Sequence, residues 1–193
     1  MEREFKWVGG GSNALRAFLA PYCKNEEEIF IDAVYYDTPD CYLTDIQGGL
    51  RLRAENQNSI CCLKLTEFAE GGLSARREYE CAAASIEAGI HGLYQTGAPA
   101  QVLDILRAKG VAPTCKVRFT RQKLFLQCGG FSGEFVFDKG RFNRETDFEE
   151  MELEFAGGDS AAFLAFGRSL RTQFALVPQP LSKLAQAILS RDH

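Results

Sequence analysis

Histidine is nearly absent from this sequence of 193 residues, which contains only His91 and His193. A metal centre with histidine ligands and a catalytic pair of a nucleophile with a histidine base are therefore both disfavoured. Acidic and basic side chains are plentiful instead, with 26 Asp and Glu and 22 Lys and Arg. Any acid–base or metal chemistry must depend on these carboxylates, lysines and arginines.

Long apolar runs are also missing. No stretch approaches the roughly 18 apolar residues that span a bilayer, and the charged N-terminus is unlike a signal peptide. With Met1 as the natural start, we expect a cytoplasmic protein. The composition, 46% hydrophobic and 25% charged, is typical of a globular chain. The length predicts a single domain over residues 1–193, since domains average about 150 residues.

Patterned cysteines and a phosphate-binding loop are absent as well. The seven cysteines include no C-x-x-C pair, so we expect them to be reduced and mostly buried. The glycines after Val8 lack the Gly-Lys-Ser/Thr ending of a phosphate loop, which favours a turn and a helix capped by Ser12. The net charge of −4 argues weakly against nucleic acid as a partner.

What the sequence does contain is charge that alternates along predicted strands. In the first seven residues, M-E-R-E-F-K-W, an extended chain places Glu2, Glu4 and Lys6 on one face. Two neighbouring carboxylates repel each other unless a cation lies between them. The segment is therefore either an exposed strand or part of a metal site.

The same period of two recurs in other segments. Leu50–Arg53 places both arginines on one face, and Glu150–Phe155 alternates three glutamates with three large apolar residues. Further strands are predicted at Ile29–Tyr36, Cys61–Thr66, Ser74–Cys81, Lys116–Gln127 and Gly133–Asp138. Helices with apolar faces are predicted at Ser12–Tyr22, Ser85–His91, Ala98–Lys109, Ser160–Phe174 and Ser182–Leu189.

For one predicted strand, the sequence does not decide which face points inward. Within Lys116–Gln127, Arg121 and Lys123 share one face, whereas Lys116 and Arg118 share the other. A single bulge would exchange the two sets.

The charged faces have two interpretations. In an ordinary antiparallel sheet they simply meet water. Alternatively, the sheet closes into a barrel with these faces inward, and so many enclosed charges require ligands. Carboxylates suit a hard divalent cation, and arginines and lysines suit a polyphosphate. We favour the barrel because the charged positions are repeatedly Glu, Arg or Lys, with acidic and basic strands segregated.

Short motifs also follow one another in a distinctive order. They are Glu2-x-Glu4-x-Lys6, Tyr35–Asp40 (Y-Y-D-T-P-D), Gly49–Arg53 (G-L-R-L-R), Leu63–Leu65, Arg76-x-Glu78, Arg121, Asp138-x-Gly140, Glu150-x-Glu152-x-Glu154 and Leu181–Lys183. Each motif alone is weak, but the ordered set resembles the CYTH, or triphosphate tunnel metalloenzyme, superfamily. The resemblance implies an α+β fold: an eight-stranded antiparallel β-barrel, or tunnel, with a charged lumen and helices packed on the outside.

The resemblance also implies roles for individual residues. It makes Glu2, Glu4 and Lys6 catalytic. Ligands of Mg²⁺ or Mn²⁺ would be Glu2, Glu4, Asp138, Glu152 and Glu154, with Glu150 ranked below them. The triphosphate would be bound by Lys6, Arg51, Arg53, Lys64, Arg76, Arg121, Lys123 and Lys183, although Lys183 could instead be a surface lysine at a helix start.

Within the superfamily the chain is most similar to bacterial inorganic triphosphatases. This implies metal-dependent hydrolysis of inorganic triphosphate to pyrophosphate and phosphate, with a small-molecule triphosphate as the partner rather than nucleic acid or a membrane. Adenylyl cyclase or thiamine triphosphatase activity of the same superfamily remains an alternative. So does a non-catalytic module that binds polyphosphate or nucleotide, although the full set of carboxylates disfavours it.

Overall fold

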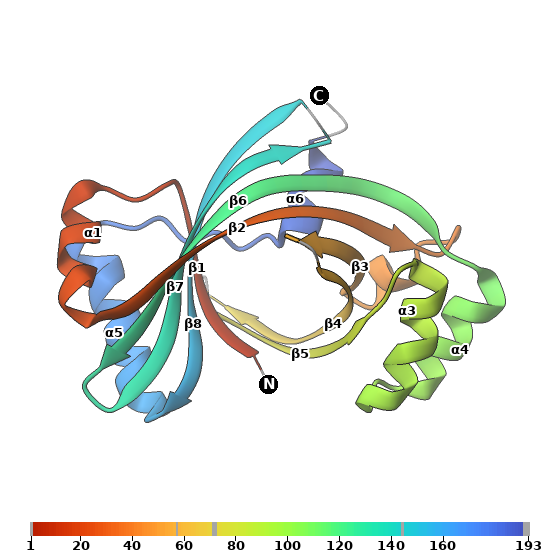
Figure 1. Ribbon diagram of the computed structural model, residues 1–193, viewed down its shortest axis with the longest axis horizontal. Coiled ribbons are helices and arrows are strands. Elements are labelled where there is room, and N and C mark those ends of the chain that lie inside the picture. Colours follow the sequence, from red (N-terminus) through yellow and green to blue (C-terminus); the bar gives the residue numbers. More distant parts are fainter. Residues whose placement is uncertain (1, 57, 71–72, 144, 191–193) are drawn as a thin grey trace.

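The computed structural model describes residues 2–56, 58–70, 73–143 and 145–190, with the backbone alone for residues 2, 67–70 and 74. In these ranges the strands close into an antiparallel barrel in the order β1-β5-β4-β3-β2-β6-β7-β8 (Figure 1). The strands are β1 (Glu2–Val8), β2 (Cys23–Asp37), β3 (Gly48–Glu55), β4 (Asn58–Glu70), β5 (Leu73–Ala82), β6 (Ala112–Cys128), β7 (Phe131–Phe142) and β8 (Thr146–Gly158).

Helices cover the barrel from two sides. Figure 1 shows α1 and α5 together at one side and α3 and α4 at the opposite side, while α6 packs against β6. The helical elements are α1 (Asn13–Leu19), η1 (Ala20–Tyr22), α2 (Tyr42–Asp45), α3 (Ile86–Leu93), η2 (Tyr94–Thr96), α4 (Ala100–Lys109), α5 (Ser160–Gln173) and α6 (Lys183–Leu189). The predicted eight-stranded antiparallel barrel with helices outside is confirmed. No helix in the described ranges has the length and hydropathy needed to cross a membrane.

Strand pairing decides which side chains share the lumen. Residues directly opposite each other on antiparallel strands point to the same face, and Glu4 pairs with Glu154 while Lys6 pairs with Glu152. The strand with two possible inward faces is also decided, because Arg121 pairs with Asp138 in the lumen. Arg118 lies outside, where its Nε donates to Asp32 Oδ2 at 2.7 Å.

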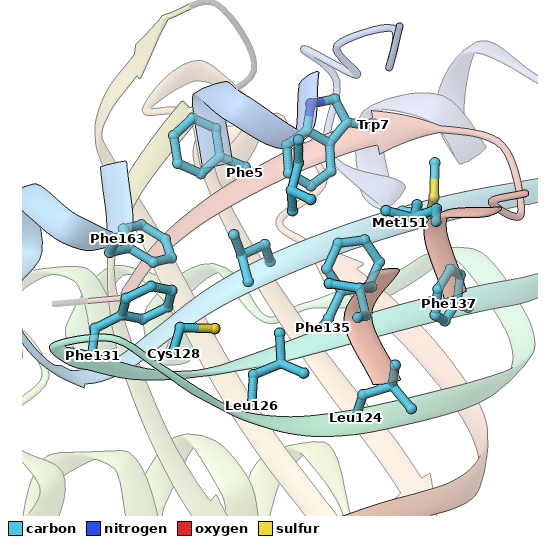
Figure 2. Packing of buried hydrophobic residues seen from close by; sticks show 14 residues of the cluster. Phe5, Trp7, Leu124, Leu126, Cys128, Phe131, Phe135, Phe137, Met151 and Phe163 are labelled. Atoms are coloured by element: carbon cyan, nitrogen blue, oxygen red, sulfur yellow. The ribbon is translucent and has the colours of Figure 1, made fainter. Parts of the chain in front are cut away.

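The outer face of β1 is held by an aromatic cluster beneath α5 (Figure 2). Phe5 and Trp7 stack with ring centroids 5.7 Å apart, and Phe163 of α5 lies 5.5 Å from Phe5. Phe5 and Trp7 are both buried. Because successive strand residues point to opposite faces, burying these two rings outside directs Glu4 and Lys6 into the barrel.

One wall of the lumen is apolar, which the charge pattern did not predict. Ile29, Ile31 and Tyr35 of β2 and Phe119 of β6 line the same cavity as the charged residues. These side chains form a buried cluster that also contains Ala187 of α6. An apolar inner face is stable here because α6 supplies apolar partners, so β2 and the adjoining part of β6 differ from the strands with charged inner faces.

Asp37, within the Y-Y-D-T-P-D motif, holds the turn after β2. Its carboxylate accepts hydrogen bonds from the backbone N–H groups of Thr38, Leu43 and Thr44 and from the Thr44 hydroxyl, at 2.7 to 3.0 Å. Asp37 is itself buried. Asp37 therefore has a structural role in this turn.

Asp37→Ala is expected to lower the free energy of unfolding by about 2–4 kcal/mol, because three backbone donors lose their partner in a buried turn. Urea denaturation measures the loss. Asp40→Ala, in the same turn but at an exposed position, is the matched control and should lose clearly less. Equal losses in the two variants would contradict the structural role of Asp37.

Candidate active site

The barrel encloses a cavity lined mainly by charged side chains from several strands. Of the residues predicted for the site, the following line it: Glu4, Lys6, Arg51, Arg53, Lys64, Arg121, Lys123, Glu152, Glu154 and Lys183. They come from β1, β3, β4, β6, β8 and α6. Segments that are distant in the sequence therefore contribute to one site.

A first carboxylate cluster, formed by Glu4, Glu152 and Glu154, faces this cavity. One oxygen of each lies within 4.8 Å of the others. Glu4 and Glu154 are directly paired on β1 and β8. Because carboxylate oxygens at this separation are typical ligands of hard divalent cations, the cluster has the chemistry and spacing of a metal site.

A second carboxylate cluster, formed by Asp138, Glu150 and Glu152, surrounds the ammonium of Lys183. The Lys183 Nζ lies 2.8 Å from Asp138, 2.5 Å from Glu150 and 2.8 Å from Glu152. All four residues are buried. The lysine thus occupies the place that a cation would take among these carboxylates, and it is not a surface residue at a helix start.

Burial and charge act against each other on these groups. Burial works to raise the pKa of Glu152, but Lys183, Lys6 and Arg121 outweigh it and hold that pKa well below its ordinary value. The pKa of Glu4 is lowered against the same effect of burial, chiefly by Lys6. Burial prevails at Glu150 and raises its pKa. Glu4 and Glu152 are therefore ionised at neutral pH, which is the charge state that a metal ligand requires.

Burial and charge also act against each other on Lys6, which lies between the two carboxylate clusters. Burial works to lower the pKa of Lys6, but Glu4, Glu150 and Glu152 raise it overall. Its Nζ lies 3.5 Å from Glu4 and 3.3 Å from Glu152. Lys6 therefore remains charged beside the first carboxylate cluster.

The remaining basic side chains are also held by carboxylates. Arg121 donates from Nε and Nη2 to the two oxygens of Asp138, both at 2.8 Å. Lys64 lies 3.1 Å from Glu78. Further pairs are Arg53 with Glu55 and Glu80 at 2.7 and 2.9 Å, Lys123 with Glu134 at 2.9 Å, and Arg76 with Glu4 at 3.5 Å. The cations are thus pre-oriented, and carboxylates balance them within the cavity.

Some predicted site residues do not line the main cavity. Arg76 lines a smaller neighbouring cavity, and Asp138 is fully buried behind Arg121 and Lys183. The Glu2 side chain lies outside the described residues, although its backbone pairs with Arg76. The roles of these three residues stay predictions, as do those of the residues that line the main cavity.

Three further lining residues, Glu55, Glu80 and Tyr35, received no site role from the sequence. The alternation does place Glu80 on one face with Arg76 and Glu78, and one further step from Arg53 would have found Glu55. Tyr35 belongs to a predicted strand, but the apolar character of its face gave no sign that it turned inward.

The chain is similar in sequence to known proteins. Residues 1–188 match the family model of the CYTH domain. Over 164 residues the chain is 27% identical to an inorganic triphosphatase of Haemophilus influenzae, a match that covers 81% of this chain and 45% of that protein. The chain therefore spans less than half the length of this curated relative.

Solved structures share the fold. A Hippeastrum protein, described as a candidate adenylyl cyclase with a dominant triphosphatase activity, has a TM-score of 0.67 at 16% identity, covering 99% of this chain and 96% of that one. A protein from Pyrococcus horikoshii OT3 has a TM-score of 0.62 at 15% identity and covers both chains completely. At these identities the likeness concerns the fold alone.

Proposed function

The chain belongs to the CYTH domain family, and we propose that it hydrolyses inorganic triphosphate to pyrophosphate and phosphate in a metal-dependent reaction inside the barrel. The observation that carries the proposal is the first carboxylate cluster standing beside a row of basic side chains in one cavity. The similarity to an inorganic triphosphatase supports this class of substrate.

Glu4, Glu152 and Glu154 would hold Mg²⁺ or Mn²⁺, with Glu2 as a further predicted ligand. The second carboxylate cluster fits a metal less well, because Lys183 already neutralises it. When bound, the metal neutralises phosphate oxygens and lowers the pKa of a coordinated water.

The chain's own residues then bind and orient the substrate. Arg121, Lys64 and Arg51 donate charge-assisted hydrogen bonds to the phosphate oxygens. They need little reorganisation because neighbouring carboxylates already hold most of them. Lys6 stabilises negative charge next to the metal-binding carboxylates. Glu154, the most accessible of the three, accepts a hydrogen bond from the attacking water at a carboxylate oxygen, so no covalent nucleophile is needed.

Phosphate release from tripolyphosphate tests the proposal. We expect hydrolysis with Mg²⁺ or Mn²⁺, loss of activity to background with excess chelator, and recovery when excess metal is restored. The physical reason is that cavity carboxylates balance the cations, so the charge of the substrate remains uncompensated without a divalent ion.

Parallel assays distinguish the alternatives. ATP and thiamine triphosphate are supplied under the same conditions, and cyclic AMP is measured beside phosphate. If none of tripolyphosphate, ATP and thiamine triphosphate is hydrolysed, the enzymatic proposal is contradicted. Cyclic AMP as the main product from ATP would instead favour the cyclase alternative.

A further inference from the structure

Tyr35 stands between two cavities of the barrel. The main cavity has a volume of about 260 Å³ and the smaller one about 60 Å³. Three residues line both: Tyr35, Arg51 and Lys64. Arg51, a predicted triphosphate ligand, is therefore placed at a boundary and has space on either side.

Arg51 is held less firmly by carboxylates than the other arginines of the main cavity. Its Nη2 lies 3.7 Å from Glu78, whereas Arg121 makes two hydrogen bonds of 2.8 Å to Asp138. Glu78 is also shared with Lys64 and with the Cys62 thiol. The buried Nε of Arg51 has no hydrogen-bond partner among the described residues. Carboxylates alone therefore do not fix this guanidinium.

Tyr35 is the cross-strand neighbour of Arg51. The two residues are paired directly across β2 and β3, so their side chains project from neighbouring positions into the lumen. Burial acts to lower the pKa of Arg51, but its neighbours Cys62, Tyr35 and Glu78 raise it overall. Tyr35 is itself buried and lines the same two cavities as Arg51.

We propose that Tyr35 is a positioning residue whose hydroxyl holds the Arg51 guanidinium toward the main cavity, where it binds the substrate triphosphate. This inference rests on the proposed function. A phenol oxygen can accept a hydrogen bond from a guanidinium N–H, so Tyr35 acts on the substrate through Arg51.

Tyr35→Phe tests the inference because it removes the hydroxyl and keeps the ring. We expect KM for tripolyphosphate and its Kd, measured calorimetrically with Ca²⁺ to slow turnover, to rise by roughly 5- to 10-fold, since one hydrogen bond is lost. We expect kcat to change less than about 2-fold. Tyr36→Phe is the matched control: Tyr36 is the next residue of β2, packs on the outer face, and its variant should behave as wild type.

A double-mutant cycle separates positioning from simple packing. If Tyr35 acts through Arg51, Tyr35→Phe should have little further effect on KM in an Arg51→Lys background. The role of Tyr35 would be overturned if Tyr35→Phe bound tripolyphosphate as wild type does, with an unchanged KM. Fully additive effects of the two changes in the cycle would overturn it as well. Either result would leave the proposed function intact. Wild-type protein that neither binds nor hydrolyses tripolyphosphate would overturn both.

Discussion

Glu154→Gln is expected to lower metal-dependent phosphate release by about 1000-fold or more, which corresponds to about 4 kcal/mol in the activation free energy. Glu154 contributes one of the three carboxylates in the first carboxylate cluster. Glutamine has nearly the same size but carries no charge, so it binds a hard divalent cation poorly. Steady-state phosphate release over a range of Mn²⁺ concentrations measures the effect.

The matched control for this change is Glu149→Gln on the same strand. Glu149 lies on the outer face of β8, where it pairs with the exposed Lys139, so its loss should leave turnover within about 2-fold of wild type. Calorimetric titration with Mn²⁺ should show weakened binding in Glu154→Gln alone. A near-normal rate in Glu154→Gln would show that this glutamate only lines the cavity.

Lys183→Met is expected to lower the free energy of unfolding at neutral pH by about 3–5 kcal/mol, because it removes the cation that lies closest to three buried carboxylates. Methionine is similar in length, so lost packing contributes little. The ammonium that is removed contacts Asp138, Glu150 and Glu152 within 2.8 Å. Urea denaturation of both proteins at pH 7 measures the difference.

The pH dependence of the stability loss in Lys183→Met identifies the cause of that loss. In the wild type, Lys183 is the largest charge effect that lowers the pKa of Glu152. A carboxyl with a lowered folded-state pKa stabilises the protein above its ordinary pKa, and this stabilisation is lost as the pH falls. The deficit of Lys183→Met should therefore be largest above about pH 4.5, the ordinary value for glutamate, and should shrink at lower pH.

A surface lysine, Lys139, provides the matched control for Lys183→Met. Lys139→Met removes an exposed ammonium that pairs with the exposed carboxylate of Glu149, and it should leave stability nearly unchanged at neutral and at acid pH. A deficit in Lys183→Met that stayed constant from neutral to acid pH would indicate lost packing rather than uncompensated charge.

Much of the site was predictable from local alternation. In Glu150–Phe155 the period of two separates glutamates from large apolar residues, and the structure places Glu150, Glu152 and Glu154 in the lumen with Met151 and Leu153 packed outside. The same rule places Arg51 with Arg53 and Arg121 with Lys123. Such strands are predictable because only one of their faces can be buried against apolar helices.

Strand length was less predictable where charge interrupts the pattern. The run Glu26–Glu28 hid the first half of β2, which extends from Cys23 to Asp37 instead of beginning at Ile29. Its backbone is held by pairing with β6, and side-chain preference carries no information about such a distant partner.

The sequence by itself determined which side chains share a face within each strand, because that depends only on the alternation of the extended backbone. Tertiary structure alone decided which faces meet. Barrel closure set Glu4 opposite Glu154, packing of α6 brought Lys183 into the second carboxylate cluster, and the same helix allowed β2 to turn Tyr35 inward. These contacts join residues far apart in the chain, so they depend on strand order and helix packing rather than on any local pattern.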